Sequence, residues 1–176
     1  MMTRAELKRA WEDWTEEHSD VLTHAVTFTM QQTVNHGLSP NANDGYVFEK
    51  ISPLSASKNL RLFISLLNRD IYGSAWDKHG KGIYIFSTIE GITSDKHIHI
   101  HSAVGFPDRR LSDAEIDYKV KHFWKKTTFG KSQSEIVVKS MHNKIGWLNY
   151  IQKEMNSTGD YIQIETLSLP KSDKRS

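Results

Sequence analysis

The sequence predicts an α+β domain built on an antiparallel central sheet. A β-branched and aromatic run at 21–30 reads as a strand, and two further strand-like runs, 82–90 and 96–104, follow with a short connection between them. Such a connection favours an antiparallel hairpin, and helical stripes of apolar residues occur before, between and after these strands. With 176 residues the chain is long enough for one core, so a single domain over 1–176 is expected, with its core at about 21–169.

Apolar residues at three- and four-residue steps predict four helices. Their expected positions are 3–18, a helix from Ser55 or Ser57 as N-cap to near Gly73, 111–124 with a Ser112–Glu115 capping box, and 143–154. Turn-forming residues fill 33–47, where a long exposed loop is expected. A short strand at 134–139, an edge strand at 161–169 and a charged tail at 170–176 complete the prediction.

Histidines alternate with isoleucines in the strand that contains His97, His99 and His101. Because strand side chains alternate between faces, all three imidazoles are expected on one face and the isoleucines on the core side. Same-face neighbours lie about 6.6 Å apart and can share one divalent ion, whereas His97 and His101, about 13 Å apart, cannot easily do so. The pattern therefore predicts a two-histidine metal site, although a half-exposed strand that is merely rich in histidine has the same pattern.

Glu90 ends the preceding strand, near the turn of the expected hairpin. A carboxylate there can complete a metal site with the histidines, and a solvated strand-end carboxylate is the simpler alternative. In a simple hairpin the pair His97/His99 lies more directly opposite Glu90. The residues alone therefore leave open which histidine pair binds.

The composition excludes several classes of protein. The chain has no cysteine, so it cannot form disulfides or thiolate zinc sites, and any metal must be held by histidine and carboxylate. It lacks an apolar signal core, a run of about 18 apolar residues and a Gly-rich phosphate loop. A cytoplasmic protein that is neither membrane-bound nor an ATP-driven motor is expected.

Positive charge is densest between Lys119 and Lys131, a stretch without acids and with interleaved aromatic rings. Cations beside aromatic rings suit a surface that follows a nucleic-acid backbone and stacks bases, so this stretch is expected to contact DNA through Lys121, Lys125, Lys126 and Trp124. An ordinary amphipathic helix with a solvated lysine face explains the same stretch equally well.

Three motifs stand in order along the chain: Phe28-Thr29-Met30-Gln31-Gln32, Glu90 followed by His99-Ile100-His101-Ser102-Ala103-Val104 with Pro107, and Gly146-Trp147-Leu148-Asn149-Tyr150-Ile151-Gln152-Lys153. This ordered set resembles the HUH endonucleases, specifically the single-tyrosine initiators of rolling-circle replication in plasmids and single-stranded DNA phages. The resemblance covers about 21–155. It departs from the family pattern in the first motif, where glutamines stand in place of the usual asparagines, and in its two overlapping His-x-His pairs.

The resemblance implies a ferredoxin-like (RRM-like) palm with the His-x-His strand in the middle, helices packed on the opposite face and the tyrosine helix crossing the histidine face. It implies Tyr150 as nucleophile, Lys153 as an accessory cation, and Mg²⁺ or Mn²⁺ held by Glu90, His99 and His101, with His97 as an alternative ligand. Thr29 and Gln31 are then expected to contact DNA. Residue by residue, a packed tyrosine and a solvated lysine are the simpler explanations for Tyr150 and Lys153.

The implied function is site-specific nicking and joining of single-stranded DNA at a replication origin, with a host helicase and polymerase as partners. An HUH-type transposase is a close variant. A two-histidine phosphoesterase fits poorly, because it needs two His-x-Ser/Thr motifs on its sheet, and within the expected strands only His101-Ser102 offers anything similar. A non-enzymatic nucleic-acid-binding module is the remaining alternative.

Overall fold

A computed structural model describes residues 4–38, 46–92, 97–107, 110–130, 135–153 and 161–162. Its main sheet has the strand order β6-β1-β5-β4-β7, and every neighbouring pair is antiparallel. The strands are β1 (His24–Thr29), β4 (Tyr84–Glu90), β5 (His99–Gly105), β6 (Ile136–Ser140) and β7 (Tyr161–Ile162). The predicted α+β class is confirmed, and the His-x-His strand β5 is the middle strand of the sheet.

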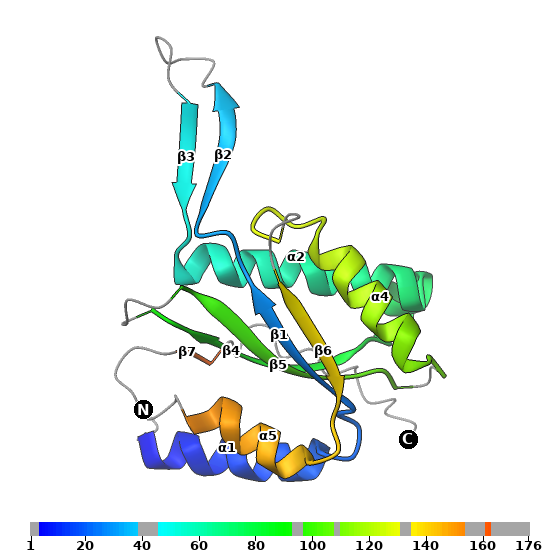
Figure 1. Ribbon diagram of the computed structural model, residues 1–176. Coiled ribbons are helices and arrows are strands. Elements are labelled where there is room, and N and C mark those ends of the chain that lie inside the picture. The colour runs from blue at the N-terminus through cyan, green and yellow to red at the C-terminus, as the bar shows by residue number, and fades with distance from the viewer. Residues whose placement is uncertain are drawn as a thin grey trace.

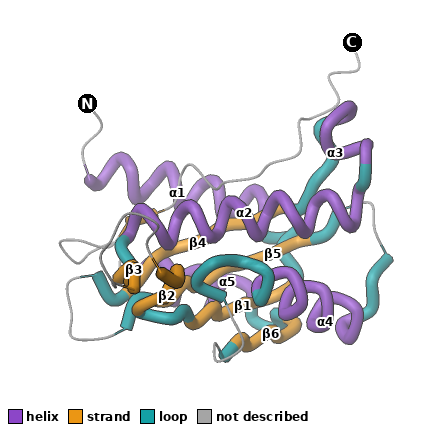
Figure 2. Tube along the Cα trace, turned by 90° about the horizontal axis from the view of Figure 1, so that it is seen from above, coloured by secondary structure: helices purple, strands orange, loops and turns teal. Residues whose placement is uncertain are grey.

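Helices cover the two faces of the sheet unequally (Figures 1 and 2). The long helix α2 (Pro53–Tyr72) and α4 (Asp113–Trp124) pack on one face and enclose the larger core, and the short α3 (Ser74–His79) follows α2. On the other face lie α1 (Arg4–His18) and α5 (Lys144–Lys153), over a smaller apolar cluster. The tyrosine-bearing helix α5 therefore crosses the sheet face opposite to α2 and α4.

Residue alternation along β5 decides which side chain meets which layer. Ile100 is fully buried in the core beneath α2 and α4. His101 lies on the other face, where its ring contacts Trp147 and Tyr150 of α5. The histidines thus face α5 because the β-strand period is two.

Capping residues determine where the two long helices begin. Ser52 caps α2 through a reciprocal box in which its Oγ accepts from Ser55 N at 3.1 Å and Ser55 Oγ accepts from Ser52 N at 2.8 Å. The predicted N-caps Ser55 and Ser57 were wrong, because Pro53 is favourable at the first helical position and Ser55 serves at N3.

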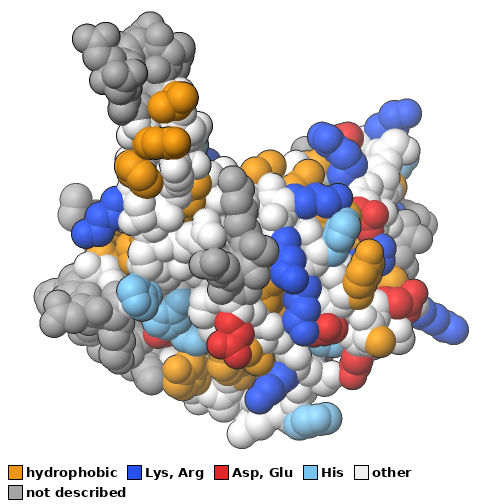
Figure 3. Space-filling view, turned by 45° about the horizontal axis from the view of Figure 1, so that its top comes forward, with side chains coloured by type: hydrophobic (Ala, Val, Ile, Leu, Met, Phe, Trp, Pro, Cys, Tyr) orange, Lys and Arg blue, Asp and Glu red, His pale blue; other side chains and the backbone are white. Residues whose placement is uncertain are grey.

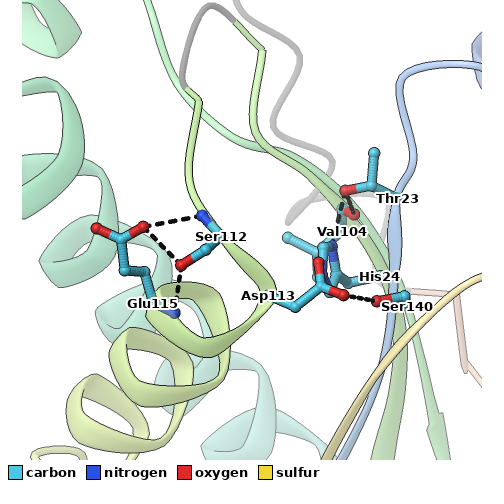
Figure 4. Close-up of polar contacts among 7 residues, drawn as sticks. All are labelled: Thr23, His24, Val104, Ser112, Asp113, Glu115 and Ser140. Atoms are coloured by element: carbon cyan, nitrogen blue, oxygen red, sulfur yellow. Dashed lines mark hydrogen bonds and ion pairs between the residues drawn. The ribbon is translucent and has the colours of Figure 1, made fainter.

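The predicted Ser112–Glu115 box at the start of α4 is confirmed (Figure 4). In the same close-up Asp113 accepts a hydrogen bond from Ser140 of β6 and lies 3.3 Å from Nε2 of the buried His24 of β1. Burial opposes the charged form of Asp113, but the Ser140 hydrogen bond, the largest effect, and His24 lower the pKa of this carboxyl. The first turn of α4 is thereby attached to two strands.

The predicted loop at 33–47 is wrong in its described part. Thr33–Leu38 forms β2 and Tyr46–Lys50 forms β3, which pair as a separate two-stranded hairpin projecting from the body (Figure 1). Residues 39–45, which carry most of the turn formers, lie outside the described residues. The many turn-forming residues of this stretch obscured the pattern of two short strands. Val34 of β2 is buried in the core.

Two further predictions are described only in part. The predicted edge strand at 161–169 is described at β7 alone, which pairs with the free edge of β4, and the tail 170–176 lies outside the described residues.

Among the helices of the described ranges, none combines the length and the apolar character needed to span a bilayer.

Gly105, at the end of β5, packs directly against the backbone before β1. A Cβ added there would lie 1.9 Å from the carbonyl oxygen of Val21. We expect Gly105→Ala to lower the free energy of unfolding by about 3 kcal/mol, because the backbone must move to relieve this overlap. Urea unfolding measures the effect, with Gly82→Ala as the milder control, since its added Cβ meets only a side-chain atom of Asn68, at 3.1 Å. Equal stability of the two variants would contradict the prediction.

Candidate metal centre and neighbouring tyrosine

The register of the β4–β5 hairpin brings Glu90 and two histidines together. Glu90 lies opposite His99, and Thr88 lies opposite His101, so Glu90, His99 and His101 project from one face. The strand β5 begins at His99, which leaves His97 in the exposed segment ahead of it. The pair next to Glu90 is therefore His99/His101, and the alternative ligand His97 lies outside this group.

These three side chains have the geometry of a metal-binding group. Glu90 Oε2 lies 3.3 Å from His99 Nε2 and 3.4 Å from His101 Nε2, and the potential ligand atoms all lie within 4.8 Å of one another. Atoms bound to one ion at about 2.1 Å are roughly 3–4 Å apart. Glu90 and His101 are buried and His99 is half-buried, so the group is shielded from bulk water. It could hold a metal ion.

Hydrogen bonds on the far side of each imidazole orient both rings toward Glu90. His99 Nδ1 donates to the carbonyl oxygen of His97 at 2.9 Å, and His101 Nδ1 lies 3.0 Å from the hydroxyl of Thr27. A neutral His99 with its proton on Nδ1 therefore points an unprotonated Nε2 at a carboxylate oxygen. Such a contact is repulsive unless a proton or a metal ion lies between the two atoms, and Nδ1 hydrogen bonds of this kind are usual for metal-binding histidines.

Glu90 supplies a second sign of a cation site. Its other carboxylate oxygen, Oε1, is buried and makes no hydrogen bond within the described residues. A buried carboxylate oxygen without a partner is costly, and a bound cation would remove that cost. The donor set of two imidazoles and a carboxylate thus fits a divalent ion.

The metal-free group is expected to make stability depend on acid pH. Burial raises the pKa of Glu90, but hydrogen bonds from His101 and His99 and their charge outweigh it and lower the pKa from 4.5 to about 2. Since the folded pKa lies below the unfolded one, this contribution to stability is complete above about pH 4.5 and is lost as pH falls toward 2.

We expect the wild type in EDTA to lose on the order of 3 kcal/mol more unfolding free energy than Glu90→Gln across this interval. Urea unfolding at a series of pH values measures the difference. Within this pH interval Glu90→Gln removes the titration of Glu90 and keeps the lowered titration of Asp113, so parallel pH profiles for the two proteins would contradict the prediction.

Tyr150 lies beside the metal-binding group. Its ring centroid is 5.3 Å from that of His101 and 5.3 Å from that of Trp147, on which it stacks at 17°. Trp147 is held in turn by a hydrogen bond of 3.1 Å from its Nε1 to the carbonyl oxygen of Ser102 on β5. Tyr150 is 39% exposed, so its ring is packed on one side and open to solvent on the other. Lys153 ends α5, and its side chain lies outside the described residues.

The first motif lines a cavity of about 440 Å³ next to the metal-binding group. Residues 29–32 and 97–99 and Glu135 form its walls, so Thr29, Gln31 and His97 all reach it. The Gln32 side chain accepts a hydrogen bond from Ile98 N at 3.0 Å and donates to Ile98 O at 3.1 Å. Gln32 therefore ties the segment ahead of β5 to the end of β1 and helps to place His99.

The described part of the basic segment, residues 119–130, lies on the face of the sheet opposite to this site. Lys121, Lys125 and Lys126 belong to α4 and the turn after it, on the face opposite to α5, and Lys121 pairs with Asp117 at 2.7 Å. The predicted stacking of DNA on Trp124 is wrong, because its ring is fully buried against Phe28, with centroids 4.2 Å apart. The aromatic residue of this segment serves the core.

Sequence reasoning missed two residues that orient the site. Thr27 lies opposite His101 on β1, and Trp147 stands three residues before Tyr150 on α5. The available signals were the alternation that puts Thr27 on the same face as Thr29, and the helical spacing of Trp147 and Tyr150.

Comparison of the chain with protein-family models, with curated proteins and with solved structures gives no match.

Proposed function

We propose that this protein is a metal-dependent, site-specific endonuclease and strand-transferase of single-stranded DNA, with Tyr150 as the nucleophile. The observation that carries the proposal is the 5.3 Å separation between the rings of Tyr150 and His101, which puts a half-exposed phenol next to a metal-binding group. A phenol beside a group that could hold a cation is an arrangement that supports phosphodiester transesterification.

Glu90, His99 and His101 would hold Mg²⁺ or Mn²⁺, which when bound would polarise the scissile phosphate and stabilise the charge that develops on it. The phenolic oxygen of Tyr150 attacks phosphorus as its proton leaves. The new bond joins tyrosine to the 5′-phosphate, and the broken bond releases the 3′-oxygen, which takes up a proton as a hydroxyl.

This covalent link keeps the energy of the phosphodiester, so the same site can rejoin DNA by the reverse reaction. Trp147 positions the Tyr150 ring, while Thr27 and the carbonyl oxygen of His97 keep both Nε2 atoms directed at Glu90. Lys153, three residues after Tyr150 on α5, would stabilise charge on the phosphate.

The biological role that we propose rests on the resemblance of the three ordered motifs to those of the rolling-circle initiators. Nicking and joining by one tyrosine start and end rolling-circle replication, and this is the role we propose. A host helicase and a host polymerase are the partners that we propose for strand separation and synthesis.

A pool of single-stranded oligonucleotides of random sequence tests the proposal without a defined origin. The protein is incubated with the pool and Mn²⁺, and any peptide–DNA adduct is mapped by mass spectrometry. An adduct on Tyr150 supports the proposal, whereas an adduct on Tyr161 would reassign the nucleophile. Tight binding without cleavage would favour a binding module, and cleavage confined to hairpin DNA by an obligate dimer would favour a transposase.

A further inference from the structure

The hairpin of β2 and β3 exposes large apolar side chains away from the core. Leu38 is 67% exposed, Tyr46 60% and Phe48 63%, although each lies within a regular strand. Figure 3 shows apolar side chains in a row along the projecting hairpin. Side chains of this size bury only part of their apolar area in that position, and a row of them on a surface points to a binding role.

The register places these side chains on one face of the hairpin. Tyr46 lies opposite Leu38, Phe48 opposite Asn35, and Lys50 opposite Thr33. Since alternate residues of β3 share a face, Tyr46, Phe48 and Lys50 project together. We call Leu38, Tyr46, Phe48 and Lys50 the aromatic face.

The opposite face of the hairpin has a different chemistry. Val34 is buried in the core, and Glu49 pairs with His36 at 2.9 Å. The only carboxylate of the described hairpin residues is therefore on the side away from Tyr46 and Phe48. The aromatic face combines exposed rings with one cation and carries no acid among those residues, a combination that is complementary to a nucleic-acid strand.

The hairpin begins at the rim of the cavity next to the metal-binding group. Residues 29–32 line that cavity and lead directly into β2, and Ile51 N at the end of β3 donates to the carbonyl oxygen of Gln32 at 2.8 Å. Figure 3 shows histidine side chains gathered below the hairpin on the same visible face as its apolar row. A DNA strand bound in the cavity would therefore continue onto the hairpin.

Two geometric facts favour DNA over a second copy of this chain. The rings of Tyr46 and Phe48 are tilted by 47° with centroids 6.3 Å apart, so they do not stack on each other, and their spacing suits consecutive nucleotides of an extended strand. A stable dimer buries about 800 Å² on each partner, which is more than the exposed parts of these few side chains supply.

We propose that the aromatic face binds single-stranded DNA beside the nick, with bases stacked on Tyr46 and Phe48 and a phosphate near Lys50. The identity of the ligand rests on the proposed function. Base stacking on exposed rings is tolerant of sequence, so this surface would supply affinity while the cavity and the metal-binding group determine the cleavage position.

The test measures binding without cleavage. Fluorescence anisotropy of a labelled oligothymidylate of about 20 nucleotides is recorded in EDTA for the full chain. We expect Tyr46→Ala and Phe48→Ala each to weaken binding about tenfold, Tyr46→Trp to retain it, and Lys50→Ala to reduce the slope of log K against log salt by about 0.7. Val47→Ala is the matched control, because Val47 is an exposed β3 residue on the opposite face.

A second readout is specific for stacking. Oligonucleotides with one 2-aminopurine should lose fluorescence on binding to the wild type and lose less of it with Phe48→Leu, which keeps an apolar side chain and removes the ring. Unchanged affinity and unchanged quenching in the ring variants would overturn the proposal. So would a wild-type dimer that these substitutions disperse without affecting DNA binding.

The outcomes separate this inference from the nuclease proposal. If no Tyr150 adduct forms in Mn²⁺ but binding in EDTA depends on Tyr46 and Phe48, the aromatic face is supported and the nuclease proposal fails. If the adduct forms and neither ring affects binding, the nuclease proposal is supported and the aromatic face is overturned.

Discussion

Tyr150→Phe is expected to abolish the covalent protein–DNA adduct and to lower the rate of nicking by at least about 10³-fold. The substitution removes only the phenolic oxygen, which is the proposed attacking atom. The ring that stacks on Trp147 and contacts His101 remains, so the fold and the metal-binding group should be preserved. Adduct formation on a labelled single-stranded oligonucleotide in Mn²⁺, followed on a denaturing gel, measures the effect.

Tyr118→Phe is the matched control for this experiment. Tyr118 is also an exposed tyrosine stacked on an aromatic neighbour, His122, but it lies on α4, on the opposite face of the sheet. Its variant should form the adduct at the wild-type rate. An adduct that persists in Tyr150→Phe and disappears in Tyr118→Phe would sink the proposed mechanism.

His101→Ala is expected to weaken Mn²⁺ binding by at least about 100-fold. Removal of a ligand should cost more than the 10- to 100-fold typical of an outer hydrogen-bond partner. His101 is buried and faces Glu90 at 3.4 Å, so no other described side chain replaces its Nε2. Isothermal titration calorimetry of the DNA-free protein measures the affinity and does not depend on any enzymatic activity.

His97→Ala tests the register of the histidine strand with the same method. Its ring is exposed and lies outside the group around Glu90, so its loss should change the Mn²⁺ affinity less than threefold, roughly within the scatter of a surface substitution. Thr27→Val is an intermediate case, because it removes the hydroxyl next to His101 Nδ1 and should weaken binding by about 10-fold. A larger effect for His97→Ala than for His101→Ala would show that the ligand pair has been assigned wrongly.

Local sequence patterns predicted most of the strands of the sheet, its candidate metal-binding strand and the start of one helix. The alternation at 97–101 indicated a metal-binding strand, and the Ser112–Glu115 spacing indicated the start of α4. Each of these signals lies within one element, where strand or helix periodicity alone determines which side chains share a face.

The remaining errors come from competition between elements. Trp124 lies within the basic segment, but its ring is fully buried against Phe28 and Phe63, so core packing keeps it from the surface. The strands β2 and β3 were hidden by turn formers, since a two-stranded hairpin of this length has little signal of its own.

By itself, the sequence determined the α+β class and the histidine face of β5, and its motifs singled out Glu90 and Tyr150 as candidate site residues. Only the tertiary structure decided that Glu90 meets His99 and His101 and not His97, because that choice depends on the pairing of β4 with β5. It also decided that α5 crosses the histidine face while the lysines of α4 lie behind the sheet. Periodicity specifies the face of a side chain within its own strand or helix, whereas register and layer are set by packing between elements that are distant in sequence.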